Sequence, residues 1–274
     1  MRGLQAEIVF PLKMICYIGF LVTFCHFFQT GQTQFWPTAT RNVTVNATIT
    51  VNVSTTFNCN YTRYIPNPTT LGNGGSTETQ RPVFTLQTGA TLSNCIIGAA
   101  PGTEGSADGV HCRQAGCNVT NVWFENVGED AMSFFGNTSA NLAFTVRGGG
   151  ARNAADKVIQ FNGRGTVFVY DFWVDTFTRF ARTCGNCAQQ YERHFVFSNL
   201  TAINGTAGQY VAGINFNYND SAIITDLKLG GASARNVPAC KRFLGVTSGE
   251  SRSNGTDPDG TYCIYDPADI TYLN

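Results

Sequence analysis

Hydrophobic and polar residues alternate strictly over one segment near the start of the chain. Every second position from Val43 to Val53 is aliphatic, and the positions between them are Thr or Asn. Side chains of a strand point alternately to its two faces, so this period of two predicts extended structure with one apolar face.

From Val83 onward, short segments rich in Val, Ile and Phe recur. Their starts lie 23 to 29 residues apart, at Cys95, Val119, Leu142, Thr166, Phe195 and Ile223.

This recurrence predicts an all-β fold, a parallel β-helix whose coils place apolar side chains in a lumen and stack on one another. No amphipathic helical stretch of useful length separates the segments, which disfavours alternating strands and helices. Asn and Gly are expected at the bends between sheets. The main competitor is an antiparallel sandwich with hairpin turns. Between Cys95 and Ile223 the only Asn-Gly pairs that resemble such turns are Asn162-Gly163 and Asn204-Gly205, so the β-helix is preferred.

The N-terminal part of the chain has the pattern of a targeting segment. Arg2 and Lys13 precede an apolar run from Met14 to Phe28, which is short for a membrane span and suits a secretory signal. We therefore expect residues 1–31 to be a signal peptide and residues 32–274 to be one domain of a secreted protein. A signal anchor is the alternative. No later stretch is apolar enough to span a bilayer, so no membrane association is expected once the signal is removed.

Charge and cysteine content narrow the class of protein. The 274 residues carry no formal net charge and only 13% are charged, so nucleic-acid binding through a broad basic field is not expected. Eight cysteines follow the signal, which in a secreted chain indicates disulfides of open connectivity. The Cys184-x-x-Cys187 pair also suggests zinc or thiol exchange, but export favours a structural bond. Ten Asn-x-Ser/Thr sites predict a glycoprotein.

Charged residues cluster around five motifs that occur in order. These are Asp108-Gly-Val-His-Cys112, the Asn121 to Ala131 segment with Gly128-Glu-Asp130, Gly148 to Lys157, Val158 to Gly163, and Arg182-Thr-Cys-Gly-Asn-Cys187. In these motifs the chain resembles the class III pectate lyases from about Pro82 to Asp220. The resemblance implies a secreted, right-handed parallel β-helix that cleaves polygalacturonate, the pectin polymer of plant cell walls, by Ca²⁺-dependent β-elimination. We expect it to act as a monomer.

The resemblance also implies roles for individual residues. Asp108, Glu129 and Asp130 are the expected Ca²⁺ ligands, since this cation takes six to eight oxygen ligands. The expected catalytic residues are basic, namely Lys157, Arg179 and Arg182. Lys157 is a candidate base if the cation and the two arginines lower its pKa, whereas Arg182 is the other candidate or a bidentate contact for a substrate carboxylate. Arg193 and Glu78 are expected to bind substrate, and His111 is expected to be structural.

Three positions depart from the family pattern. Phe135 stands where the family usually has Lys, Asn126 where it has Asp, and Arg179 where it has Lys. The first two changes remove charges near the expected site, so a weakened or non-catalytic pectin-binding homologue is a second hypothesis. A pectin glycoside hydrolase is a third, and it would need a pair of carboxylates placed for acid and base or nucleophile roles. The set of Lys and Arg residues favours elimination.

Overall fold

The computed structural model describes residues 36–75, 77–78 and 80–273. The expected signal peptide, residues 1–31, lies outside the described residues. Among the described residues, no helix has the length and apolar character needed to cross a bilayer. The described chain is almost entirely β-structure and forms one compact unit from Trp36 onward.

Short strands at the start of the described chain give way to long strands in its middle. The strands are β1 (Asn42–Val45), β2 (Ile49–Val51), β3 (Thr56–Asn58), β4 (Arg63–Pro66), β5 (Phe84–Leu86), β6 (Thr91–Ile97), β7 (Val110–Cys112), β8 (Asn118–Phe124), β9 (Asp130–Phe134), β10 (Ala143–Phe161), β11 (Gly165–Thr183), β12 (Arg193–Asn215), β13 (Ser221–Gly230), β14 (Cys240–Leu244), β15 (Arg252–Ser253), β16 (Cys263–Ile264) and β17 (Ile270–Tyr272). Three short 3-10 helices, η1 (Phe216–Tyr218), η2 (Ala234–Asn236) and η3 (Pro267–Asp269), connect the last strands. The expected alternating strand is therefore split into β1 and β2 by a bend.

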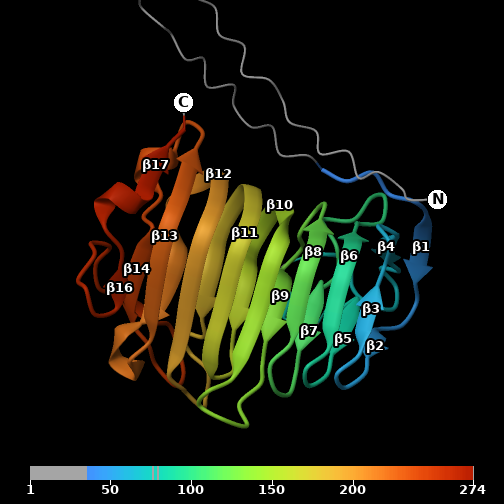
Figure 1. The fold of residues 1–274 in the computed structure, drawn as a ribbon, viewed down its shortest axis with the longest axis horizontal. Coiled ribbons are helices and arrows are strands. Elements are labelled where there is room, and N and C mark those ends of the chain that lie inside the picture. Colours follow the sequence, from blue (N-terminus) through green and yellow to red (C-terminus); the bar gives the residue numbers. More distant parts are fainter. Residues whose placement is uncertain (1–35, 76, 79, 274) are drawn as a thin grey trace, which may run out of the picture. The chain divides into compact units, whose positions relative to one another are not determined.

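Successive coils pair in parallel, as Figure 1 shows for the strands from β6 to β13. Among the described strands only β14 and β15 pair antiparallel. The parallel β-helix is thus confirmed and the antiparallel sandwich is wrong. Adjacent parallel strands lie about 4.8 Å apart, so residues one coil apart in sequence become neighbours in space.

A row of left-handed residues forms one corner of the coils. Positive φ angles of 48° to 63° occur at positions that the strand register places one above another: Asn94, Asn121, Gly148, Asp171, Asn199 and Asp226. Asn, Asp and Gly tolerate this conformation best. Their side chains also bond along the row, since Asn199 donates to Asp171 over 2.8 Å. The expected Asn and Gly corners are confirmed, and Asn204-Gly205 is a second corner within β12 rather than a hairpin turn.

The lumen is filled by stacked aromatic rings as well as aliphatic side chains. Phe134, Phe144, Phe161, Phe195 and Phe197 are fully buried, with neighbouring ring centroids 5.1 to 6.4 Å apart. Such pairs add packing energy beyond their burial. The core therefore supports the faces of the sheet from inside.

All eight cysteines of the described chain form disulfides. The pairs are Cys59–Cys95, Cys112–Cys117, Cys184–Cys187 and Cys240–Cys263. The expectation of a disulfide framework is confirmed. The Cys-x-x-Cys motif is one of these bonds and does not supply zinc ligands in this structure.

Candidate active site

Strand register brings together residues that lie far apart in sequence. Asp130 of β9 pairs with Lys157 of β10, Lys157 with Arg179 of β11, and Arg179 with Tyr210 of β12. Both pairings of the long strands shift register immediately before this row, after Ala154 and after Phe177. A one-residue shift turns side chains to the other face of a strand. The extra residues lie in β10 before Lys157 and in β12 before Tyr210, so they change the faces on which these two side chains lie.

Three acids surround the ammonium group of Lys157. Glu129, Asp130 and Asp156 each offer a carboxylate oxygen, and these oxygens lie within 4.8 Å of one another. The Lys157 Nζ lies 3.0 Å from Glu129 Oε1 and 3.3 Å from Asp130 Oδ1, and it also pairs with Asp156. Glu129 and Asp130 are two of the three expected metal ligands. Asp156 was not expected, although it directly precedes Lys157 in the sequence.

Burial and the charges of neighbouring groups together set the pKa values in this cluster. Burial raises the pKa of Asp130 well above its usual value, against the opposing effect of Lys157, and also raises the pKa of Glu129. Burial alone would lower the pKa of Lys157. The carboxylates of Asp130, Asp156 and Glu129 outweigh that effect and raise it. Without a competing cation, Lys157 is therefore held as a charged ammonium, contrary to the lowered pKa that a catalytic amine needs.

The cluster fits a hard divalent cation by its donor set. All three members offer carboxylate oxygens, which Ca²⁺ prefers, and the buried Asp130 Oδ1 accepts no hydrogen bond. Asp108, the third expected ligand, is not part of this group of oxygens. Its Oδ1 is nevertheless buried without a hydrogen bond, and its negative charge acts on both Glu129 and Asp130.

Asp108 is held by a short side-chain relay. Its Oδ2 lies 2.9 Å from His111 Nε2, and Arg113 Nη2 lies 3.2 Å from His111 Nδ1. An arginine can only donate, so Nδ1 is the acceptor and Nε2–H donates to Asp108. Phe135 packs on this relay, with its ring centroid 4.9 Å from that of His111 and 5.2 Å from the Arg113 guanidinium carbon. His111 is therefore structural, and Phe135 occupies its position by packing rather than by charge.

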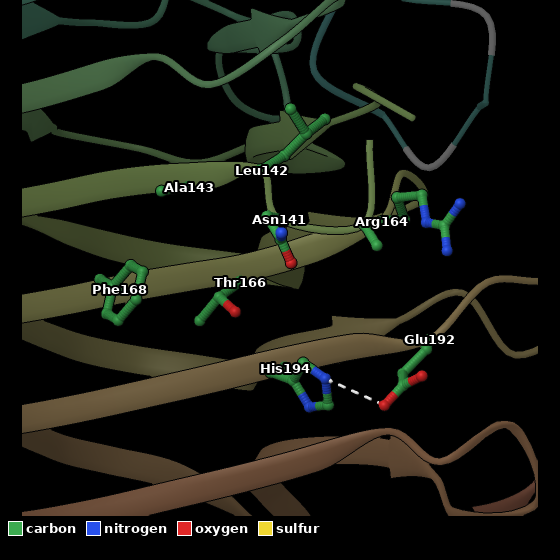
Figure 2. A pocket seen from close by; sticks show the side chains of 9 residues that line it. Asn141, Leu142, Ala143, Arg164, Thr166, Phe168, Glu192 and His194 are labelled. Carbon is green, nitrogen blue, oxygen red and sulfur yellow. Dashed lines mark ion pairs between the residues drawn. The ribbon is translucent and has the colours of Figure 1, made fainter. Parts of the chain in front are cut away.

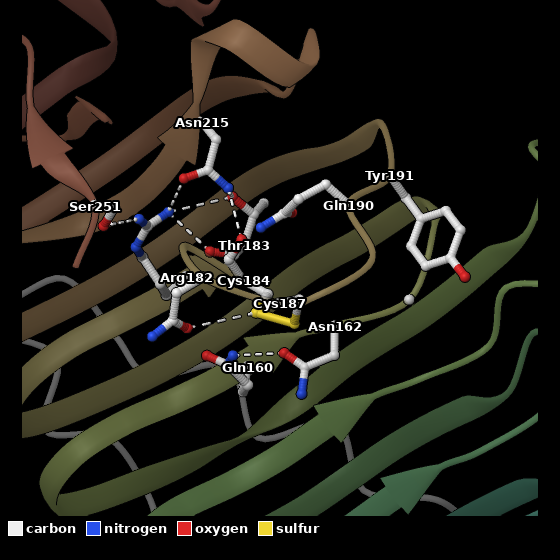
Figure 3. The surroundings of a disulfide bond; sticks show 12 residues. Gln160, Asn162, Arg182, Thr183, Cys184, Cys187, Gln190, Tyr191, Asn215 and Ser251 are labelled. Carbon is white, nitrogen blue, oxygen red and sulfur yellow. Dashed lines mark hydrogen bonds between the residues drawn. A yellow bond between two sulfur atoms is a disulfide. The ribbon is translucent and has the colours of Figure 1, made fainter. Parts of the chain in front are cut away.

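Arg182 lies in a pocket of neutral partners (Figure 3). Its Nη1 donates to Asn215 Oδ1 over 2.9 Å and to the Thr183 carbonyl over 2.8 Å, and its Nη2 donates to Ser251 Oγ over 3.0 Å. The ring of Phe243 covers the guanidinium at 4.1 Å. Burial lowers the pKa of Arg182. Arg179 differs, because its guanidinium pairs with Asp156 and its Nε donates to Gln209.

A polar groove of about 440 Å³ connects these groups. Its lining residues are Glu78, Lys157, Gln160, Arg179, Arg182, Gly185, Asn186, Gln209, Tyr210, Lys241, Phe243, Glu250 and Ser251. The three expected catalytic residues and Glu78 thus face one space. Tyr210 and Lys241 were missed, because only the register of β12 and β14 reveals that they belong here.

Arg193 lies elsewhere. It is fully buried, and its guanidinium donates to the carbonyls of Gly163 over 2.7 Å and Asn162 over 2.9 Å, and to Gln190. These bonds tie two coils together and leave no exposed donor for a ligand. Its expected contact with substrate is therefore not supported by its position. Asn126 also points elsewhere, because its amide donates to the Glu104 carbonyl over 3.4 Å.

Comparison with known families decides the assignment. The family described as pectate lyase matches residues 33–250 of this chain. The chain belongs to the pectate lyase family. Among curated pectate lyases, pectate lyase H of Emericella nidulans is 41% identical over 184 residues, which cover 67% of this chain and 65% of the relative. Probable pectate lyase D of the same species is 40% identical, over 69% of this chain and 67% of the relative. The aligned segment thus spans about two thirds of these pectate lyases.

Solved pectate lyase structures share the fold. The catalytic domain of pectate lyase PelI from Erwinia chrysanthemi superimposes with a TM-score of 0.68 and 28% identity, covering 85% of this chain and all of that domain. PelI in complex with tetragalacturonic acid gives a TM-score of 0.63 and 27% identity, covering 86% of this chain and 71% of that one. Pectate lyase Pel3 from Pectobacterium carotovorum gives a TM-score of 0.68 and 27% identity, covering 84% of this chain and 68% of that one.

Proposed function

We propose that this protein is a Ca²⁺-dependent pectate lyase that cleaves polygalacturonate by β-elimination. The observation that carries the proposal is the groove lined by Lys157 and Arg182. The Lys157 ammonium contacts a cluster of carboxylates, and the buried Arg182 donates to neutral partners. Membership of the pectate lyase family and the PelI complex with tetragalacturonic acid support the substrate class.

We propose Glu129, Asp130 and Asp156 as the residues that hold Ca²⁺, with Asp108 adjoining them. When bound, Ca²⁺ would neutralise a uronate carboxylate and stabilise the negative charge that develops beside it. The cluster is already crowded by the ammonium of Lys157, 3.0 Å from Glu129. Loading the site therefore requires Lys157 to give up part of its contacts with these acids, which would lower the pKa of Lys157.

We propose Arg182 as the group that accepts the C5 proton. Its partners are neutral and burial lowers its pKa, whereas Lys157 is held charged by three acids. As the C5–H bond breaks, its electron pair forms the C4–C5 double bond, the C4–O bond breaks, and the leaving oxygen takes up a proton. Lys157 and Arg179 would bind the substrate carboxylate as cations.

The direct test is the ultraviolet absorbance of the unsaturated product released from polygalacturonate. We expect product with Ca²⁺, none in excess chelator, and recovery when Ca²⁺ is restored. Arg182→Ala is expected to lower turnover by about 10²–10⁴-fold, and Arg182→Lys to retain a fraction with a shifted pH profile. Full activity in chelator would refute the metal assignment. An Arg182→Lys variant with an unchanged pH profile would exclude Arg182 as the proton acceptor.

A second candidate, a non-catalytic pectin-binding homologue, is favoured only by Phe135. This ring packs on His111 and Arg113 where the family usually has Lys. Polygalacturonate binding without any unsaturated product would establish that function instead.

We also propose that the protein is a secreted, monomeric glycoprotein. Four disulfides support an oxidising compartment. Nine of the ten asparagines in Asn-x-Ser/Thr sites are exposed and the tenth, Asn118, is half-buried. The exposed large hydrophobic residues among the described ones are Val53, Ile223, Leu244, Tyr272 and Leu273. Mass determination of the secreted protein before and after glycosidase treatment, with light scattering, would test each part.

A further inference from the structure

A second pocket lies over the start of β10, β11 and β12 (Figure 2). It has a volume of about 390 Å³ and is lined by the 140–143 segment, Arg164, Thr166, Phe168, Glu192 and His194. The strand segments beneath it are the first residues of β10, β11 and β12, which pair at Ala143, Thr166 and His194. The groove instead uses the later segments of the same strands, and the two cavities share no lining residue.

The polar groups of this pocket are unevenly satisfied. Glu192 pairs with His194 over 3.3 Å, and His194 Nδ1 lies 2.8 Å from Ser221 Oγ. Arg164 takes part in none of the ion pairs of the described residues. Its Nε is buried without a hydrogen-bond partner. The one carboxylate of the pocket therefore has a partner, while the guanidinium retains donors for an anion.

An aromatic ridge extends from the pocket along β11. Phe168 and Tyr170 occupy alternate, half-buried positions, and their rings stack with centroids 6.2 Å apart and planes 11° apart. Arg147 lies over Tyr170, with its guanidinium carbon 4.5 Å from the ring centroid. Arg147 also pairs with Asp171 at 3.4 Å, but both side chains are more than half exposed, so that pair is weak.

We infer that the outer face formed by Arg164, Phe168, Tyr170 and Arg147 is a second, non-catalytic binding surface for acidic polysaccharide. The inference takes its ligand, polygalacturonate, from the proposed function. Apolar faces of sugar rings pack on flat aromatic side chains, and guanidinium groups bind carboxylates in a bidentate manner. Arg164 directly precedes β11 and Tyr170 lies within it, six residues further on, or about 20 Å for extended chain. That length presents a cation, two aromatic rings and a second cation in line, which matches a chain of linked uronates.

The functional consequence is retention on the polymer. A chain bound at this face would keep the protein on pectin while the groove releases its products. Short substrates cannot reach both surfaces, so only polymeric substrate gains from the second surface. Loss of the outer face should therefore separate binding to polymer from turnover of short oligogalacturonides.

The test compares Arg164→Ala and Phe168→Ala with Arg235→Ala as a matched control. Arg235 also has its guanidinium over a tyrosine ring, 4.4 Å from the centroid of Tyr272, as Arg164 does at 5.8 Å from that of Tyr191. Arg235 is exposed, whereas Arg164 is half-buried, and Arg235 does not line this pocket. Binding is measured by retardation in gels containing polygalacturonate, with chelator present, and in gels containing neutral galactan. Initial rates with Ca²⁺ are measured on tetragalacturonate and on polygalacturonate.

We expect each outer-face variant to bind polygalacturonate roughly tenfold more weakly, with an unchanged rate on tetragalacturonate and an unchanged result for the control. Retardation equal to that of the wild type would overturn the inference, as would stronger retardation by neutral galactan or an equal loss in Arg235→Ala. A wild-type protein that is not retarded by polygalacturonate would overturn it too. Failure of the proposed lyase activity is seen separately, as absence of unsaturated product while the loss of retardation persists.

Discussion

At the scale of single residues, Lys157 has the environment of an internal counterion. Its ammonium contacts Glu129 and Asp130 and pairs with Asp156, all in a buried cluster. A divalent cation proposed for the same oxygens would compete with it directly. Under the proposed function, Ca²⁺ affinity would therefore depend on the charge of Lys157, which also stabilises the metal-free protein.

Lys157→Met should tighten Ca²⁺ binding by roughly tenfold, because removing the ammonium removes a positive charge from the site. In chelator the same variant should unfold at lower temperature than the wild type, since its buried carboxylates lose their counterion. Titration calorimetry and thermal unfolding with and without Ca²⁺ would measure both effects. Arg179→Met, which removes the more exposed partner of Asp156, is the control and should change both quantities less. Unchanged or weaker Ca²⁺ binding in Lys157→Met would contradict a shared site.

Phe135 also makes a residue-scale prediction. A lysine at this position would place an ammonium beside Arg113, whose guanidinium carbon lies 5.2 Å from the Phe135 ring. We therefore expect Phe135→Lys alone to lower activity on polygalacturonate several-fold, through like-charge repulsion. Adding Arg113→Ala should recover part of the loss. Higher activity in the single variant would mean that only the missing amine limits turnover.

At the scale of structural elements, two loops form one wall of the groove. The Val246 amide donates to the Gly185 carbonyl over 2.9 Å, Asn186 donates to the Gly249 carbonyl over 3.1 Å, and Gln190 donates to the Val246 carbonyl over 2.8 Å. The loop that carries Ser251 thus rests on the loop closed by Cys184–Cys187 (Figure 3). The Ser251 Oγ in turn accepts a hydrogen bond from Arg182 Nη2.

Removing the Cys184–Cys187 bond should therefore affect activity more than stability. The bond closes a separation of only 3 residues, for which chain entropy predicts a contribution of about 2 kcal/mol. The Cys184→Ser, Cys187→Ser double variant should lower kcat/KM on polygalacturonate about tenfold or more, because Arg182 loses its fixed orientation.

Cys59–Cys95 provides the matched control, because it closes a separation of 36 residues away from the groove lining. Its removal should cost about 4 kcal/mol by the same entropy argument, with kcat/KM nearly unchanged in the folded protein. Denaturant unfolding and initial rates would separate the two bonds. If both double variants lost stability and kcat/KM in equal proportion, the proposed role of the short loop would be wrong.

At the scale of the whole molecule, Asp220 links the ends of one coil. Its carboxylate accepts from the Arg193 amide over 2.9 Å, from the Asn215 amide over 3.1 Å and from Asn215 Nδ2 over 3.1 Å. These residues are the first and last of β12. Asp220 is fully buried, and burial raises its pKa to about 6.

The folded state therefore holds the Asp220 proton more tightly than the unfolded state does. Stability from this group is fully present below the unfolded pKa of about 4 and is lost as pH rises through about 6. The shift of about two units corresponds to about 3 kcal/mol. We expect the wild type to lose several degrees of Tm between pH 4 and pH 7 in chelator, and Asp220→Asn to show a flatter profile. Parallel Tm profiles for the two proteins would contradict this account.

The sequence determined the architecture because the β-helix is a periodic structure. The alternation from Val43 to Val53 indicates the faces of a strand, and the recurrence from Cys95 to Ile223 indicates the length of a coil. Both patterns can be recognised without knowing any tertiary contact. The chemistry of the site could also be predicted in part. The motifs around Glu129, Lys157 and Arg182 predicted a site of acidic and basic residues. In the structure Lys157 and Arg182 line the groove, and Glu129 belongs to the acidic cluster around Lys157.

Only the tertiary structure decided which side chains face each other. The bulges before Lys157 in β10 and before Tyr210 in β12 change the inward and outward alternation at the site itself, and a pattern of period two cannot locate them. The stacking of coils places Asp156, Tyr210 and Lys241 at the site. Arg193 is instead buried, and its guanidinium donates to the backbone carbonyls of Asn162 and Gly163. Residue types and coil spacing are local properties of the sequence. Neighbours across coils depend on register, which is set by the packing of the whole lumen.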